Sequence, residues 1–77
     1  MKAGLIALNI GNRIRYLRIA KHMTIGELAK KVMVSPSLIS QVEKGKCQCS
    51  VFTLSKIVDA FGEKLSNFLI NIENSKL

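Results

Sequence analysis

The stretch TIGELAKKVMVSPSLISQVEKG, residues 24–45, reads as two short helices separated by a tight turn. Thr24 followed by Glu27 forms a T-x-x-E capping box, which predicts that a helix begins directly after the threonine. Ser35 followed by Pro36 supplies an N-cap and a proline at the first helical position, where the missing N–H costs nothing. Each helix therefore has its own start signal.

The two helices differ in the faces that they turn outward. The residues predicted to face inward are Leu28, Ala29 and Val32 on the first helix and Ile39 and Val42 on the second. The second helix covers about residues 36–44 and is closed by Gly45 at C′. It leaves a strip of small or polar side chains outward, namely Pro36, Ser37, Ser40, Gln41 and Lys44. An ordinary solvent face carries Glu–Lys pairs, whereas this strip is nearly free of acid. This is the layout of a helix-turn-helix, whose second helix enters the DNA major groove.

Length and charge narrow the classes of protein. At 77 residues the chain forms one small domain. Its 48% hydrophobic content argues for a folded core and against a disordered basic tail. Twelve Lys and Arg against five Asp and Glu leave a net charge of +7. That balance favours a polyanionic partner, either nucleic acid or an anionic membrane surface.

Apolar periodicity outside the opening stretch predicts three further helices and no strand. Asn9 is the predicted N-cap of a first helix that ends at about Lys21. Ser50 is the predicted N-cap of a fourth helix that Gly62 ends. The apolar stripes that mark these helices are Ile10, Ile14 and Leu17 in the first, Val51, Leu54, Ile57, Val58 and Phe61 in the fourth, and Leu65, Phe68, Leu69 and Ile72 in the fifth. The expected fold is all-α: a compact five-helix bundle in one domain, with its core at about residues 10–69.

Four segments in order carry a resemblance to a known family. They are I-x-x-R-I-R-x-L-R from Ile10, E-L-A from Glu27, S-P-S-x-I-S-Q-x-E-x-G from Ser35, and S-V-x-T-L-x-K-I from Ser50. With these segments at the family's spacing, the chain from Ile10 to about Leu69 resembles the lambda-repressor-like (Xre/Cro) helix-turn-helix DNA-binding domain. The resemblance implies a lambda-repressor-like bundle and sequence-specific binding of double-stranded DNA by a transcription regulator.

Within that family, the pattern is closest to the N-terminal domain of regulators that carry a C-terminal cupin sensor. In that subgroup the chain continues past the fifth helix, whereas this sequence stops almost at once. It is therefore either a natural stand-alone domain or an excised piece whose C-terminal sensor domain is missing. The sequence leaves open which of these holds, what the effector is, and whether transcription is repressed or activated.

Three positions depart from the family pattern. Ile25 stands where many members have a glutamine that helps to clamp a phosphate. Only the backbone N–H of Ile25 can bind a phosphate at this position. Met33 stands in the turn where glycine is usual, and we expect it to adopt a positive φ. The segment Cys47–Cys49 replaces a linker that is usually basic or contains proline. Some of the family's phosphate contacts thus lack an equivalent side chain here.

The residues expected to bind DNA are Thr24, Ile25, Ser35, Pro36, Ser37, Ser40, Gln41, Lys44 and Lys46. The Gln41 amide can bond bidentately to adenine, and the Pro36 ring can touch a thymine methyl group. The two lysines lie where a DNA backbone would pass, and the N-termini of both helices offer N–H groups to phosphates. Each residue also has a purely structural reading, as a solvated serine, a helix-starting proline or an ordinary surface glutamine.

Two further expectations concern how the domain is held together and how it assembles. By the resemblance, Arg18 and Glu43 form a partly buried ion pair that fixes the second helix of the motif; the alternative is that both are solvated. Because one such helix covers only about 4–5 base pairs, we expect a homodimer on a palindromic site. The apolar residues expected at a symmetric contact are Phe68, Leu69, Ile70 and Ile72.

Other classes of protein find less support. Cys47 and Cys49 are two candidate metal ligands and His22 is the only histidine, which is too few for a structural zinc site. We expect no metal, no cofactor and no catalysis. No segment is long enough to cross a bilayer and no convincing signal sequence is present, so the expected location is the cytoplasm. The alternative function is a cationic helical module that binds a partner protein or a membrane surface.

Overall fold

Five α-helices follow one another in the structure, a computed structural model that describes residues 3–46 and 49–74, with side-chain surroundings described for 9–46 and 49–70. The helices are α1 (Ala3–Ala20), α2 (Ile25–Val32), α3 (Pro36–Glu43), α4 (Val51–Ala60) and α5 (Leu65–Asn74). No strand occurs in the described residues. The predicted all-α, five-helix fold is confirmed.

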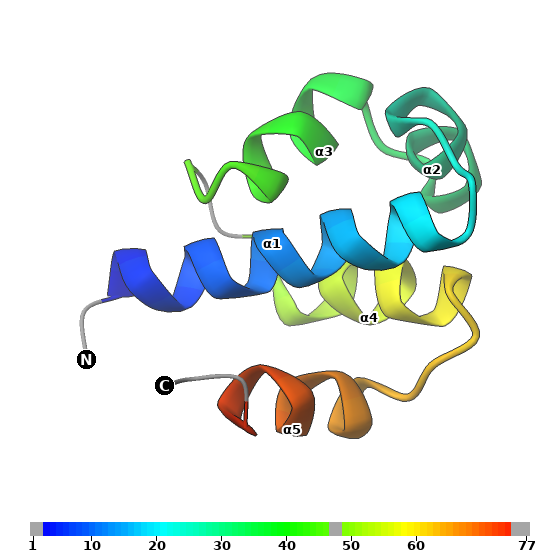
Figure 1. Cartoon of the computed structure of the whole chain (residues 1–77). Coiled ribbons are helices and arrows are strands. Elements are labelled where there is room, and N and C mark those ends of the chain that lie inside the picture. The colour runs from blue at the N-terminus through cyan, green and yellow to red at the C-terminus, as the bar shows by residue number, and fades with distance from the viewer. Residues whose placement is uncertain (1–2, 47–48, 75–77) are drawn as a thin grey trace.

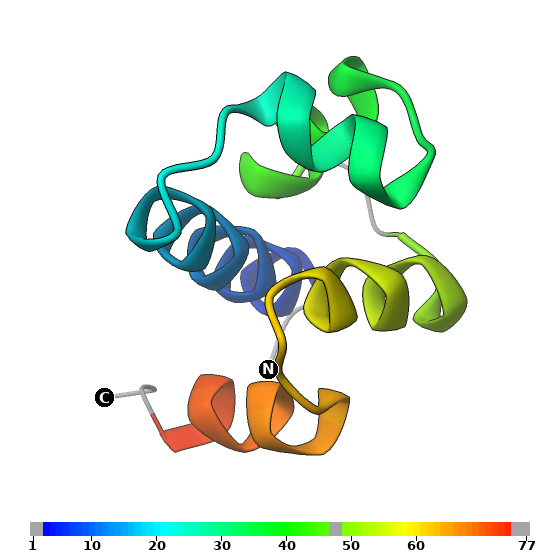
Figure 2. The ribbon, with the colours of Figure 1, turned by 90° about the vertical axis from the view of Figure 1, so that its right-hand side faces the viewer.

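The helices lie at three levels (Figures 1 and 2). Helices α2 and α3 form the upper level, α1 and α4 lie at the middle level, and α5 crosses below them. Helix α1 contacts α3 above and α5 below, while α4 contacts α2 above and α5 below. The two helices of the motif are therefore held from beneath by α1 and α4.

One apolar core fills the space between these levels. Its fully buried side chains come from all five helices and are Ile14, Leu28, Ile39, Ile57, Val58 and Phe68. The inward faces predicted for α2 and α3 are confirmed, because every apolar residue assigned to them is buried. This burial leaves the opposite face of α3 outside the core.

The predicted N-caps of α2, α3 and α4 are confirmed. At α2 the Thr24 hydroxyl accepts a hydrogen bond from the Glu27 N–H at 3.0 Å, and the Glu27 carboxylate accepts one from the Thr24 N–H at 2.8 Å. The Ser35 hydroxyl accepts from the Leu38 N–H at 3.1 Å, and the Ser50 hydroxyl accepts from the N–H three residues later. These bonds satisfy N–H groups that a helix start leaves unpaired, and so they define where each helix begins.

Two sequence predictions about helix limits and faces are wrong. Helix α1 begins at Ala3, so Asn9 lies within the helix instead of capping it. The residues before Asn9 are mostly alanine, leucine and isoleucine. Alanine and leucine favour the helix, so the helix starts before the asparagine and includes it. Val51, assigned to the inward stripe of α4, is 72% exposed at the first residue of that helix.

Among the described residues, none of the helices has both the length and the apolar character that crossing a membrane requires. The same part of the chain holds no group of three or more His, Cys, Asp or Glu side chains placed to bind a metal ion. His22 lies exposed just after α1 with a φ of 58°, so it helps to end that helix.

Candidate nucleic-acid interface

The turn between α2 and α3 sets the angle between these two helices. Met33 ends α2 in the left-handed region, with φ 66° and ψ 44°. Its N–H donates to the Lys30 carbonyl at 3.3 Å, and the Val34 N–H donates to the Ala29 carbonyl at 3.0 Å. This is the usual hydrogen-bonding pattern of a left-handed helix end, here without the glycine that adopts it most easily. The positive φ predicted for Met33 is confirmed.

An ion pair ties α3 to α1 beneath it. The Arg18 guanidinium donates from Nε to Glu43 Oε2 at 2.6 Å and from Nη2 to Oε1 at 3.1 Å. Its Nη1 donates to the Met23 carbonyl at 2.8 Å, so the same side chain also holds the segment that leads into α2. The two side chains are only 11% and 5% exposed, which confirms the predicted buried pair. The hydrogen bond to Glu43 raises the pKa of Arg18 above its ordinary value, although burial works against it.

A second contact between α1 and α3 was not expected from the sequence. Gly11 is buried, and a Cβ at this position would lie 2.2 Å from the Val42 carbonyl oxygen and 2.6 Å from that of Glu43. The backbone of α1 thus passes directly under the last turn of α3. A glycine in the middle of a helix, where it is normally unfavourable, was the available signal.

The outward face of α3 consists of side chains suited to contact with a nucleic acid. Pro36, Ser37, Gln41 and the C-cap Lys44 are exposed, while Ser40 is half-buried. The single acid of the helix, Glu43, is turned inward and neutralised by its ion pair. The face therefore presents one amide, hydroxyl groups and a positive end, without a carboxylate to repel phosphates.

The other predicted DNA-binding residues lie at the ends of the two helices. Thr24 and Ser35 are exposed, and each hydroxyl already accepts a capping bond, which leaves its own O–H to donate outward. Ile25 is half-buried and packs against the core. Lys46 is exposed after α3, and its N–H donates to the Gln41 carbonyl at 2.9 Å. The fold thus brings the predicted residues to α3 and to the N-termini of α2 and α3. Cys47 of the predicted linker lies outside the described residues.

The surface predicted for self-association is only partly as expected. Phe68 is 0% exposed, so its assignment to a dimer contact is wrong: α5 packs on α4 and α1 closely enough to enclose this ring. Leu69 and Ile70 remain 43% and 53% exposed. The side chain of Ile72 lies outside the part of the chain whose side chains are described.

Comparisons with known proteins agree with this geometry. The family model described as Helix-turn-helix (HTH_3) matches residues 14–68. An uncharacterised HTH-type transcriptional regulator of Methanocaldococcus jannaschii is 37% identical over 59 residues, which make up 77% of this chain and 89% of that protein.

Solved structures give the same answer. The crystal structure of the clp gene regulator ClgR from Corynebacterium glutamicum has a TM-score of 0.86 and 30% identity, over 91% of this chain and 74% of that one. The restriction-modification controller protein C.Esp1396I shares the fold, with a TM-score of 0.81 and 20% identity over 90% of this chain and 91% of its own. The chain belongs to the Xre/lambda-repressor-like helix-turn-helix (HTH_3) family, whose members are transcriptional regulators and not enzymes.

Proposed function

We propose that this regulator acts in the cytoplasm as a homodimer and binds a palindromic double-stranded operator, with α3 of each copy in the major groove. The observation that carries the proposal is the outward face of α3. It combines Pro36, Ser37, Gln41 and Lys44 without an exposed acid, and the helix is held against α1 by a buried ion pair. A rigid helix with short side chains is what entry into a groove about 12 Å wide requires.

The residues divide into those that read bases and those that hold the backbone. In this proposal Gln41 bonds bidentately to adenine, Ser37 bonds to a base edge, and Pro36 touches a thymine methyl group. Half-buried Ser40 has a more restricted reach. Phosphates would be held by Lys44 and Lys46, by the hydroxyls of Thr24 and Ser35, and by the N–H groups at the helix starts, including that of Ile25.

Specificity in a genome supplies the argument for two copies. One recognition helix reads about 4–5 base pairs, so a dimer on two half-sites about one helical turn apart gives useful discrimination. Exposed Leu69 and Ile70 on α5 are the proposed symmetric contact, with Ile72 as its continuation along the same helix.

Selection from a random duplex library tests the proposal. The full chain should enrich one palindromic sequence with half-sites about 10 base pairs apart. A Ser37→Glu variant places a carboxylate on the α3 face and should enrich nothing, because that charge repels phosphates. The control Ser55→Glu makes the same change at an exposed position of α4, away from both α3 and the proposed contact on α5, and should enrich the same palindrome as the unmodified chain.

Two results would overturn the proposal. One is an absence of any enriched duplex although the chain is folded. The other is binding to vesicles of anionic lipid without binding to DNA, which would support the alternative of a cationic membrane-binding module.

A further inference from the structure

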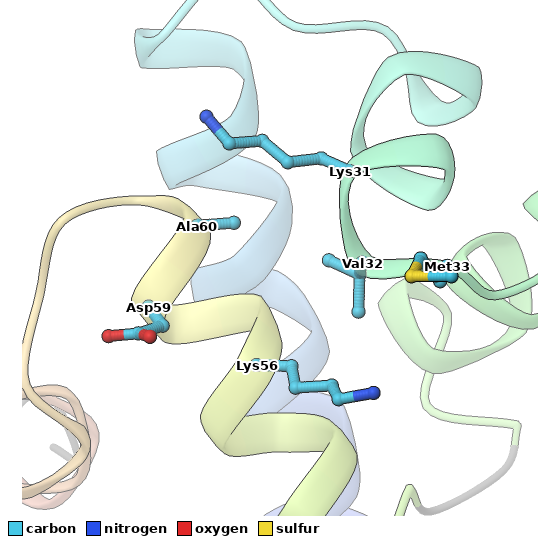
Figure 3. Close-up of a pocket in the computed structure, with 6 residues that line it drawn as sticks. All are labelled: Lys31, Val32, Met33, Lys56, Asp59 and Ala60. Carbon is cyan, nitrogen blue, oxygen red and sulfur yellow. The ribbon is translucent and has the colours of Figure 1, made fainter.

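A cleft of about 330 Å³ lies between the end of α2 and the outer side of α4. It is lined by Lys31, Val32 and Met33 from α2 and its turn, and by Lys56, Asp59 and Ala60 from α4 (Figure 3). None of these residues belongs to the set proposed to bind DNA. The cleft is therefore a second surface that DNA recognition leaves unexplained.

The charges of the cleft are unevenly placed. Figure 3 shows the Lys31 side chain extending from α2 above the end of α4, and the Lys56 side chain extending from α4 below Val32 and Met33, toward the side on which α2 and α3 lie. Val32 points into the space between the two helices, and Ala60 faces it from α4. The Asp59 carboxylate points away from this space. The cleft thus presents two ammonium groups around an apolar floor, with its one acid turned outward.

Exposed apolar side chains extend the cleft at both helices. Met33 is 85% exposed. Its left-handed backbone costs about 1 kcal/mol relative to a glycine at the same position, so the side chain does not contribute to the stability of the turn. Phe52 is 71% exposed one turn before Lys56, whose Nζ lies 4.7 Å from the centre of its ring. Exposed methionine and aromatic side chains are enriched on surfaces that bind other proteins.

We infer that this cleft binds an acidic segment of a partner protein, in which carboxylates lie on either side of an apolar side chain. The carboxylates pair with Lys31 and Lys56, and the apolar side chain covers exposed Met33 and half-buried Ala60. A DNA backbone offers phosphates but nothing to cover exposed Met33 and Phe52. A small organic anion is normally enclosed by its site, whereas here the apolar surface continues onto exposed side chains outside the cleft.

Selection of random peptides displayed on phage against the full chain provides the probe. We expect peptides rich in Asp and Glu around Leu, Phe or Met to be enriched. A fluorescein-labelled synthetic copy of the strongest peptide is then titrated with each variant by fluorescence anisotropy. When the unlabelled peptide is added to the ¹⁵N-labelled chain, the largest changes in amide chemical shift should occur at Lys31, Val32, Met33 and Lys56.

Charge variants separate the cleft from the general positive charge of the chain. The double variant Lys31→Glu, Lys56→Glu should bind the peptide about tenfold or more weakly, since two attractive pairs become repulsive. The double variant Lys21→Glu, Lys64→Glu changes the net charge equally at exposed positions outside the cleft and should bind within about twofold of the unmodified chain. An equal loss in both variants would overturn the inference.

Met33→Gly separates binding from folding. Glycine adopts the left-handed backbone without strain, so the free energy of unfolding should be unchanged or higher. The loss of the apolar side chain should lower the affinity for the peptide several-fold. Unchanged peptide affinity in Met33→Gly would overturn the inference. So would enrichment of no peptide, amide shifts that fall on α3 or α5, or a small carboxylate such as citrate that binds the cleft as tightly as the peptide. Because no DNA is present, these results do not depend on the proposed operator binding.

Discussion

At the scale of single residues, the position of α3 depends on Arg18, which reaches both carboxylate oxygens of Glu43 and the carbonyl of Met23. Both side chains of the pair are almost completely buried. Removing either partner leaves a buried charge without compensation, which is far more costly than losing a surface ion pair. The contact therefore stabilises the domain and also orients the helix that is proposed to read DNA.

Glu43→Ala should lower the free energy of unfolding by about 3–5 kcal/mol, measured by denaturant titration. Asp59→Ala removes the same charge at an exposed position and should change it by less than about 1 kcal/mol. The pKa of Arg18 is raised in the folded state. The stabilisation that its positive charge gives is therefore fully present below the pKa of Arg18 in the unfolded chain and is lost only as the pH rises through the folded-state pKa. The effect of Arg18 should therefore not vary across neutral pH. A loss below about 1 kcal/mol for Glu43→Ala would mean that the pair behaves as a solvated one.

Gly11→Ala should destabilise the domain although alanine is the better helix former. The new methyl group would lie 2.2 Å from the Val42 carbonyl oxygen, so α1 and α3 must move apart, at an expected cost of about 1–3 kcal/mol. Gly26→Ala is the matched control, because only the Thr24 hydroxyl lies near its added methyl group, at 3.9 Å. That variant should be neutral or more stable, by up to about 1 kcal/mol. Equal effects of the two substitutions on the thermal midpoint would contradict the close contact.

At the scale of the helices, local chemistry predicted most of the boundaries. Thr24, Ser35 and Ser50 each cap a helix that begins at the next residue. Gly62, with a φ of 75°, ends α4 as predicted. These features depend on hydrogen bonds between residues a few positions apart, and the sequence shows such residues directly.

The features that the sequence did not predict depend on packing between distant helices. Gly11 matters only because α3 lies against it, and the chain around it reads as an ordinary helix. The burial of Phe68 follows from how closely α5 approaches α1 and α4, which periodicity alone does not define. The cleft between α2 and α4 is likewise a product of tertiary packing.

Helix α5 provides the test of the proposed dimer. Ile70→Glu changes a 53% exposed residue, so it should leave the fold intact and shift sedimentation at micromolar concentration from dimer to monomer. Phe68→Glu should instead unfold the domain, because that ring is fully buried. If the unmodified chain is already a monomer at this concentration, α5 is not a stable dimer contact in the absence of DNA.

At the scale of the whole molecule, the net charge of +7 makes affinity for DNA depend on salt. Lys44, Lys46 and the helix N-termini should neutralise about four to six phosphates per dimer, and log affinity should fall with log salt by about 0.9 for each. Lys44→Ala removes one such contact from each copy and should make the slope shallower by about 2 per dimer. An affinity that does not change with salt would contradict the electrostatic part of the account.

The central claim is that α3 reads base edges directly, and Gln41 tests it most directly. The measurement compares the unmodified chain and Gln41→Ala on the selected operator and on duplexes that carry each single base-pair change in both half-sites. Gln41→Ala should lose about 1–3 kcal/mol per half-site on the operator and lose discrimination at one base pair only, that of the contacted adenine. Discrimination that is unchanged at every base pair would contradict the claim, and so would an equal loss of affinity on all duplexes.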